Sequence, residues 1–282
     1  MTCIIKNFTS NFSNNIKLMI ISLVMIMISD VYSVNAEDKN PNWKPTSMFL
    51  LGGQSNMSGA ALSKDLPKEF SKFPPNVRMW EENTWAEMKL GEKYGPEVGF
   101  AFEMAKKWPK EKIGLVKMGS SGTNMLVWAG EAIDPKTKKE TPFGGNYNAW
   151  TQMMTKAQKS APDAVLKGVL WMQGESDAQY LEFSDHYKTN LKKIINGLRT
   201  EFNNKNLPFL IGKIQAKNFK FLATVWKAQE ETAKEVPNTC WVNTDSVELN
   251  PDVLHFSTKG QIDLGRLFAE DFLKMTTKQK KK

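Results

Sequence analysis

Three residues of this chain have the types and spacing that nucleophilic catalysis requires. Ser55 lies in the stretch 47–58, in which an apolar run ends at two glycines and a small polar cluster follows. A serine hydroxyl is a weak nucleophile until a base takes its proton, and histidine is the usual base near neutral pH. The chain contains two histidines, His186 and His255, so the choice of base is narrow.

His255 is the better placed of the two histidines. It ends the sequence Asp252-Val-Leu-His255, just before the last predicted helix. An aspartate three residues ahead of a histidine can turn back to accept its Nδ1–H, which fixes the tautomer and orientation of the ring. His186 lies inside a long helical pattern, where a structural histidine is expected. The sequence therefore favours Ser55, His255 and Asp252 as nucleophile, base and orienting acid.

Strands alternate with helices along the chain. The predicted strands are the apolar run before Ser55 and the segments 113–118, 165–172, 207–214 and 239–243. The predicted helices are 97–108, 148–160, 181–202, 219–235 and a final amphipathic helix capped by Ser257. Residues 60–94 show no clear period and are predicted to be mostly loop. This alternation predicts an α/β fold with a parallel sheet covered on both faces.

A polar turn follows each of the first three predicted strands. Ser55 lies in the first turn, the second is Gly119-Ser-Ser-Gly-Thr-Asn124, and the third is Gln173-Gly-Glu-Ser-Asp177. The carboxyl ends of parallel strands lie at one edge of a sheet, where open α/β sheets bind their ligands. We therefore expect the three turns to converge on one site.

The amino terminus has the pattern of a secretory signal peptide. Lysines precede an apolar run at 18–28, and Val34-Asn35-Ala36 gives a small-x-small ending. The run is shorter than the roughly 20 residues that span a bilayer. We predict a signal peptide at 1–36, a single domain at 37–282, a secreted or periplasmic location, and no membrane association after cleavage. Only Cys240 would remain after cleavage, so no internal disulfide is expected.

Composition and motifs exclude several other classes. The formal net charge of +8 comes largely from scattered lysines, without the basic-aromatic pattern of nucleic-acid binders. Two separated histidines and Cys240 provide no ligand cluster at zinc spacing. A Walker loop, a dinucleotide fingerprint and the Gly-x-Ser-x-Gly elbow are all missing. We expect no metal, no cofactor and no nucleic-acid partner, and the sequence leaves the oligomeric state open.

Four motifs together resemble the SGNH hydrolase superfamily. They are Gly53-Gln-Ser-Asn-Met-Ser-Gly59, Ser121-Gly-Thr123 with Trp128, Trp171-Met-Gln-Gly-Glu-Ser-Asp177, and Asp252-Val-Leu-His255. More narrowly, they are similar to its sialate O-acetylesterase and carbohydrate esterase family six branch, which includes acetylxylan esterases. The resemblance runs from about Met48 to Phe272. It implies a flavodoxin-like three-layer α/β/α sandwich and cofactor-free hydrolysis of O-acetyl esters on sugars.

The resemblance also implies roles for individual residues. Ser55 is the nucleophile, His255 the general base and Asp252 its orienting acid, but Glu175 is an alternative acid because some family members use this glutamate. The oxyanion hole is expected from the backbone N–H of Ser55, a backbone N–H near Gly122 and the side-chain amide of Gln173. Ser121 stands where the family commonly has glycine, which leaves the second N–H open.

Substrate contacts are expected from residues beside these motifs. Gln54 and Asn56 flank the nucleophile, and Trp128 belongs to the second motif. Tryptophan rings can stack on sugars, although packing in the core is the alternative for Trp128 as for Trp80 and Trp85. The sequon at Asn56 is expected to be unused, because a glycan there would block the site.

The expected function is removal of acetyl groups from an acetylated oligo- or polysaccharide, xylan-like or sialic acid, through an acyl-enzyme. A non-catalytic glycan-binding protein on the same scaffold, and an SGNH lipase or thioesterase, are the alternatives.

Overall fold

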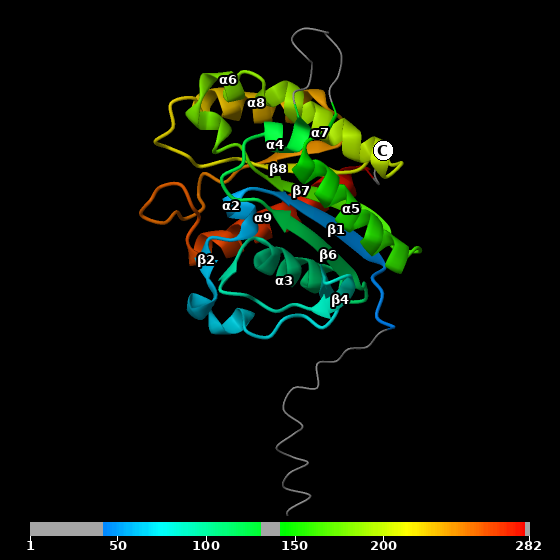
Figure 1. Ribbon diagram of the computed structural model, residues 1–282. Coiled ribbons are helices and arrows are strands. Elements are labelled where there is room, and N and C mark those ends of the chain that lie inside the picture. Colours follow the sequence, from blue (N-terminus) through cyan, green and yellow to red (C-terminus); the bar gives the residue numbers. More distant parts are fainter. Residues whose placement is uncertain (1–41, 131–141, 280–282) are drawn as a thin grey trace, which may run out of the picture. The chain divides into compact units, whose positions relative to one another are not determined.

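The computed structural model describes residues 42–130 and 142–279. The predicted signal peptide at 1–36 lies outside these residues. A seven-stranded sheet with the order β4-β3-β6-β1-β7-β8-β9 runs through the part of the chain described (Figure 1). Its strands are β1 (Ser47–Gly53), β3 (Val77–Glu81), β4 (Thr84–Glu87), β6 (Ile113–Gly119), β7 (Val165–Met172), β8 (Phe209–Gly212) and β9 (Thr239–Val242).

The five strands predicted from the sequence form most of the parallel part of this sheet, and β3 adds a further parallel strand beside β6. In chain order the predicted five are β1, β6, β7, β8 and β9, and their spatial order is therefore 2-1-3-4-5. This is the flavodoxin-like order, whose ligands bind near the carboxyl end of the first strand, where the order reverses. The predicted α/β fold with a central parallel sheet is confirmed.

Helices cover both faces of the sheet, as Figure 1 shows. Helix α3 (Glu97–Lys107) packs against α9 (Thr258–Gln279) on one face. The other face carries α5 (Gly145–Ser160), α7 (Tyr187–Glu201) and α8 (Leu222–Glu235). Short helices are α2 (Ser55–Ser58), α4 (Leu126–Ala129) and α6 (Leu181–Ser184). The three layers bury a continuous apolar core that includes Met48, Phe49, Leu50 and Leu51 of β1, and every residue of β1 is buried.

The predicted cap of the last helix is present. The N–H of Gly260 donates to Ser257 Oγ at 3.1 Å, which satisfies one N–H group of the first turn. The long helix predicted at 181–202 is instead broken between α6 and α7. Asp185 and His186 lie at this break, so His186 precedes α7 rather than lying within a helix.

The segment 60–94 contains more structure than predicted. Strands β3 and β4 form a hairpin along the edge of the sheet, with Trp80 opposite Trp85, and β2 (Ala61–Leu62) pairs with β5 (Lys93–Tyr94). Glu82 and Asn83 form the two-residue turn with φ of 48° and 61°. Such turns normally contain Asn-Gly or Asp-Gly, so Glu-Asn gives almost no hairpin signal in the sequence.

Gly53 lets β1 end close to β7. Its φ is 147°, and a Cβ atom there would collide with the carbonyl group of Met172. The N–H of Gln54 then donates to Met172 O at 2.9 Å, which fixes the start of the turn before Ser55. Among the described helices, none is long and apolar enough to cross a membrane.

Candidate active site

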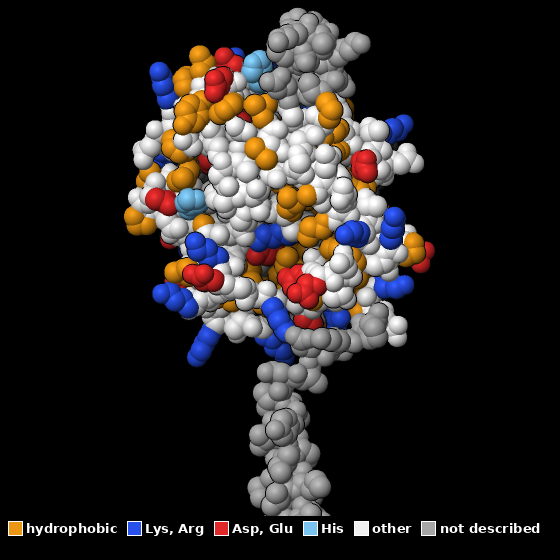
Figure 2. Space-filling view, viewed as in Figure 1, with side chains coloured by type: hydrophobic (Ala, Val, Ile, Leu, Met, Phe, Trp, Pro, Cys, Tyr) orange, Lys and Arg blue, Asp and Glu red, His pale blue; other side chains and the backbone are white. Residues whose placement is uncertain are grey.

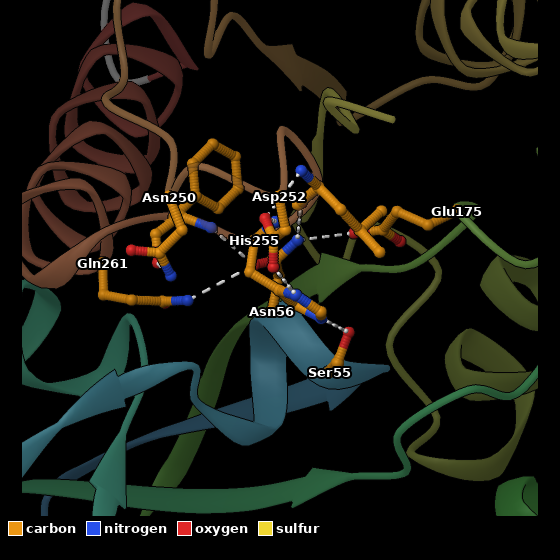
Figure 3. A network of polar contacts seen from close by, with 9 residues as sticks. Ser55, Asn56, Glu175, Asn250, Asp252, His255 and Gln261 are labelled. Atoms are coloured by element: carbon orange, nitrogen blue, oxygen red, sulfur yellow. Dashed lines mark hydrogen bonds and ion pairs between the residues drawn. The ribbon is translucent and has the colours of Figure 1, made fainter. Parts of the chain in front are cut away.

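Ser55, His255 and Asp252 meet in one hydrogen-bonded series (Figure 3). Ser55 is the first residue of α2, which begins one residue beyond the end of β1, and its Oγ lies 3.0 Å from Nε2 of His255. On the other side of the ring, Nδ1 lies 2.7 Å from Oδ2 of Asp252. This is the geometry in which a histidine can take a proton from serine while a carboxylate orients the ring.

Asp252 is held as a carboxylate. Its Oδ1 accepts the backbone N–H groups of Leu254 and His255, each at 2.9 Å. Partial burial acts to raise the pKa of Asp252, but these bonds and the one from the imidazole outweigh it and leave the pKa below its ordinary value. The negative charge is therefore present at neutral pH, where it can stabilise a protonated His255.

A strained loop brings Asp252 back toward the histidine. Val253 between them has a φ of 52°, a left-handed conformation that β-branched residues rarely adopt. The loop is closed by a hydrogen bond from the N–H of Asn250 to the carbonyl of His255 at 2.7 Å. Strain of this kind persists where the surrounding contacts enforce it, and it is common at functional sites.

Asn56 fastens the nucleophile's turn to the histidine loop. Its Nδ2 donates to the carbonyl of Leu254 at 3.1 Å, and its Oδ1 accepts the N–H of Phe256 at 3.0 Å. These two residues flank His255, so a single side chain beside Ser55 binds the backbone on both sides of the histidine (Figure 3). The side chain of Gln261 also donates to the same Oδ1, at 3.4 Å.

Glu175 contacts this network through Asn56 and not through the histidine. Its Oε1 accepts the second Nδ2 hydrogen of Asn56 at 2.8 Å, and the side chain is fully buried. Burial raises the pKa of Glu175, while the hydrogen bond from Asn56 acts in the opposite direction. Between the two candidate acids, Asp252 is the one in hydrogen-bond contact with His255.

Comparison with known proteins identifies the family. The model of a carbohydrate esterase family, the sialic acid-specific acetylesterases, matches residues 45–274. The chain belongs to this family of SGNH-type carbohydrate esterases. A probable carbohydrate esterase of Arabidopsis thaliana is 28% identical over 258 residues, covering 81% of this chain and 91% of the relative.

Solved structures share the fold of this chain. The structure of an Arabidopsis thaliana protein superposes with a TM-score of 0.68 at 22% identity, covering 82% of this chain and 98% of the other. NanS gives 0.61 at 13% identity, covering 84% and 99%. A carbohydrate acetylesterase from Xanthomonas citri gives 0.60 at 24% identity, covering 79% of this chain and 55% of the larger protein.

Gln54 and Asn56, which were predicted to contact substrate, make hydrogen bonds inside the protein. Gln54 is buried and its Oε1 accepts the N–H groups of Gly174 at 3.1 Å and Ser176 at 3.4 Å. These two hydrogen bonds join the first turn to the third. Together with the internal bonds of Asn56, they give both neighbours of Ser55 a part in holding the turns, and their expected contacts with substrate stay a prediction.

Trp128 lies in the core of the protein. Its ring has no exposed surface and packs edge-on against Trp150 and Trp171, with centroids 5.5 Å and 5.0 Å away. Its Nε1 donates to Thr123 Oγ1 at 3.1 Å, which steadies the second turn. A sugar cannot stack on a ring in this position, so the packing alternative is the correct one. Trp80 and Trp85 are buried as well.

The side chain of Gln173 has both amide hydrogens engaged. Its Nε2 donates to the carbonyl of Thr123 at 3.1 Å and to Oδ2 of Asp177 at 2.5 Å, and the residue is fully buried. Its predicted place in the oxyanion hole does not fit these contacts. The two backbone donors remain candidates for the oxyanion hole. Ser55 is the first residue of α2, so its N–H has no partner within that helix. Gly122 is exposed and has a φ of 72°.

Asp177 is a site residue to which the sequence assigns no role. It is buried, and its two carboxylate oxygens accept the N–H of Met125 at 3.0 Å and 3.1 Å, which ties the second turn to the third. Burial raises the pKa of Asp177 to about 7. The motif ending in Asp177 marks the residue, but sequence alone does not show that its carboxylate points inward. In the residues described, no cluster of three or more potential metal ligands occurs.

Proposed function

We propose that this chain is a serine-dependent carbohydrate O-acetylesterase that works through an acetyl-enzyme on Ser55. The observation that carries the proposal is the series Ser55 Oγ, His255 and Asp252, with contacts of 3.0 Å and 2.7 Å, in a member of a carbohydrate acetylesterase family. An ester of acetic acid needs a nucleophile, a proton carrier and donors for the oxyanion, and this site offers each of them.

The first half of the reaction transfers the acetyl group to the serine. His255 Nε2 takes the hydroxyl proton of Ser55 as Oγ attacks the acetyl carbonyl carbon. The carbonyl π bond opens and its electron pair moves to the oxygen, where the N–H of Ser55 and a donor of the turn at Gly122 stabilise the charge. The intermediate then expels the sugar oxygen, which receives the proton from His255.

The second half releases acetate. A water molecule gives a proton to His255 Nε2 as its oxygen attacks the acetyl carbon, and Ser55 Oγ leaves with that proton. Asp252 keeps the ring oriented and stabilises its cationic form in both halves. The substrate class is an acetylated oligo- or polysaccharide, with acetylated xylan and acetylated sialic acid as the two leading cases.

The proposal includes export. The leader predicted at 1–36 would place the enzyme outside the cytoplasm, where polymeric glycans are found. Edman sequencing of the protein purified from its producing cells tests this directly. A mature chain that begins at Glu37 supports export, whereas a chain that retains residues 1–36 contradicts it.

Acetate release tests the function. Wild type and Ser55→Ala are compared on acetylated xylan, acetylated pectin, acetylated sialic acid and p-nitrophenyl acetate, with the surface variant Ser71→Ala as the matched control. We expect Ser55→Ala to lose activity at least a thousandfold and Ser71→Ala to keep it. Labelling by a fluorophosphonate probe should depend on Ser55 in the same way.

Two outcomes would replace the proposal with another function. Glycan binding that survives Ser55→Ala, without acetate release or probe labelling in the wild type, indicates a non-catalytic binding protein. Faster hydrolysis of long-chain p-nitrophenyl esters or thioesters than of acetyl esters indicates a lipase or thioesterase.

A further inference from the structure

A pocket of about 630 Å³ opens beside the candidate active site, at the carboxyl ends of β3 and β6. This volume lies within the roughly 300–1,000 Å³ of small-molecule sites, and it far exceeds what an acetyl group needs. Its lining combines charged, polar and apolar side chains. They are Ser58, Met79, Trp80, Glu81, Glu82, Asn83, Lys89, Leu90, Gly91, Lys93, Glu97, Lys117, Gly119 and Met153.

The pocket is continuous with the turns that form the active site. Ser58, which lines it, ends the helix that Ser55 begins. Ser121, in the turn that carries Gly122, donates from its Oγ to Ser58 Oγ at 3.4 Å. The pocket therefore begins one helical turn from Ser55, within reach of a sugar unit next to the one that carries the acetyl group.

A buried ion pair supports the inner part of the pocket. Lys117 Nζ lies 2.6 Å from Glu97 Oε2, and the two side chains are only 11% and 4% exposed. Lys117 also donates to the carbonyl of Ser58 at 2.9 Å, and Glu97 Oε1 accepts the N–H of Gly95 at 3.0 Å. The charges neutralise each other and are held by further hydrogen bonds, so this wall presents fixed polar groups without a net charge.

The outer part of the pocket also mixes the two signs. Glu81, Glu82 and Lys93 are exposed there, and Lys89 lies among them. On the face of the molecule in Figure 2, acidic and basic side chains are likewise interspersed rather than segregated. Carboxylates accept hydrogen bonds from hydroxyl groups and ammonium groups donate to them. Such a lining suits a ligand with many hydroxyl groups and gives no net attraction to an anion.

The backbone at the rim of the pocket is strained at Glu82. Its φ of 48° is uncommon for a glutamate, whereas asparagine, as at Asn83, tolerates this region. The hairpin turn would form more easily with glycine or asparagine at this position. Backbone strain of this kind is common at functional sites, and here it lies in a residue that lines the pocket.

We propose that this pocket binds a neutral, hydroxyl-rich glycosyl unit of the substrate, next to the unit that carries the acetyl group. The inference rests on the proposed esterase function and narrows its substrate to acetylated neutral oligosaccharides such as xylo-oligosaccharides. The acidic and basic groups of the lining balance each other, so an acidic sugar gains no net electrostatic attraction there, whereas a neutral sugar can hydrogen-bond to both kinds of group.

The kinetic test uses two pocket variants and two substrate sizes. Glu82→Gly removes the carboxylate and suits the turn. Gly91→Tyr adds a large side chain to the pocket lining, at a position where an added Cβ meets no atom within 4 Å. Gly145→Tyr is the control, because Gly145 is equally open and lies at the start of α5, outside the pocket lining. For acetylated xylo-oligosaccharide, we expect KM to rise at least fivefold in both pocket variants, as the loss of about one hydrogen bond would produce.

The same variants should hydrolyse p-nitrophenyl acetate like the wild type, because this ester is too small to reach the pocket. Equal KM values on the oligosaccharide in wild type and both pocket variants would overturn the proposal. So would a larger effect on acetylated sialic acid than on the neutral oligosaccharide.

A binding experiment keeps the two proposals separable. Calorimetric titration with deacetylated xylo-oligosaccharide, in a Ser55→Ala background, measures the pocket without catalysis. Gly91→Tyr should weaken this binding at least fivefold and Gly145→Tyr should not; unchanged binding in Gly91→Tyr excludes the pocket even if the esterase is active. If instead the wild type releases no acetate while Gly91→Tyr still weakens binding, the proposed esterase function is contradicted and the proposed glycan pocket is supported.

Discussion

Asn56 and Glu175 are joined by a buried hydrogen bond of 2.8 Å from Nδ2 to Oε1. The bond fixes the orientation of the Asn56 amide group. With Nδ2 directed at Glu175 and at the carbonyl of Leu254, Oδ1 is left to accept the N–H of Phe256. A glutamate that is not in contact with His255 thus helps to position it.

Asn56→Asp should disable this arrangement. The new carboxylate would face the carboxyl group of Glu175 and the carbonyl of Leu254, where the asparagine donates hydrogen bonds. We expect kcat on p-nitrophenyl acetate to fall at least tenfold and the free energy of unfolding to fall by about 2 kcal/mol. Adding Glu175→Gln supplies a donor to the aspartate and should restore part of kcat, which a merely destabilised protein would not show. Unchanged kcat in the single variant would exclude the positioning role.

The two candidate acids are distinguished by isosteric amide variants. Asp252→Asn removes the carboxylate that contacts His255 Nδ1, and we expect kcat to fall by about 10⁴. Glu175→Gln keeps an oxygen that can accept from Asn56, so its kcat should fall less than tenfold. Steady-state rates on p-nitrophenyl acetate measure both, with circular dichroism to confirm folding. A larger loss in Glu175→Gln than in Asp252→Asn would reverse the assignment.

Val253→Asn should stabilise the fold. Asparagine tolerates the left-handed conformation that Val253 adopts at a φ of 52°, and the strain removed corresponds to about 1 kcal/mol. The melting temperature should rise by a few degrees. The matched control is Val165→Asn, at an exposed strand residue, which should not gain stability. A lower melting temperature for Val253→Asn would show that contacts of the valine side chain outweigh the strain.

Stability should depend on pH through Asp177. Because burial raises the pKa of Asp177 to about 7, the folded chain keeps a proton that the unfolded chain loses near pH 4. The contribution of Asp177 to the free energy of unfolding is therefore fully present below pH 4. It decreases by up to about 4 kcal/mol as the pH rises to and beyond about 7. Urea unfolding of wild type and Asp177→Asn at pH 4.5, 6 and 8 should show a shallower decline in the variant. Parallel pH profiles would contradict the assignment.

The sequence predicted those features that depend on neighbouring residues in the chain. Apolar runs ending in polar turns predicted β1, β6 and β7 and the edge at which they meet, and the local spacing of Asp252 and His255 matches their observed contact. It was less informative about the direction of side chains. Gln54 and Gln173 are polar and adjacent to the site, yet they join turns to one another, because hydrogen-bond partners far along the chain leave no local pattern. The β3–β4 hairpin was missed because Glu82 is an unusual turn residue.

Ser55 and His255 lie 200 residues apart in the chain, and the loop that carries the histidine leads directly into α9, the last helix described. During synthesis the serine leaves the ribosome long before its base exists, so an unfinished chain holds an unactivated hydroxyl. Esterase activity should therefore appear only when the carboxyl-terminal part of the chain has folded. Its recovery during refolding should follow the docking of α9 on α3 rather than the formation of the sheet, which makes a colorimetric acetate assay a reporter of the final folding step.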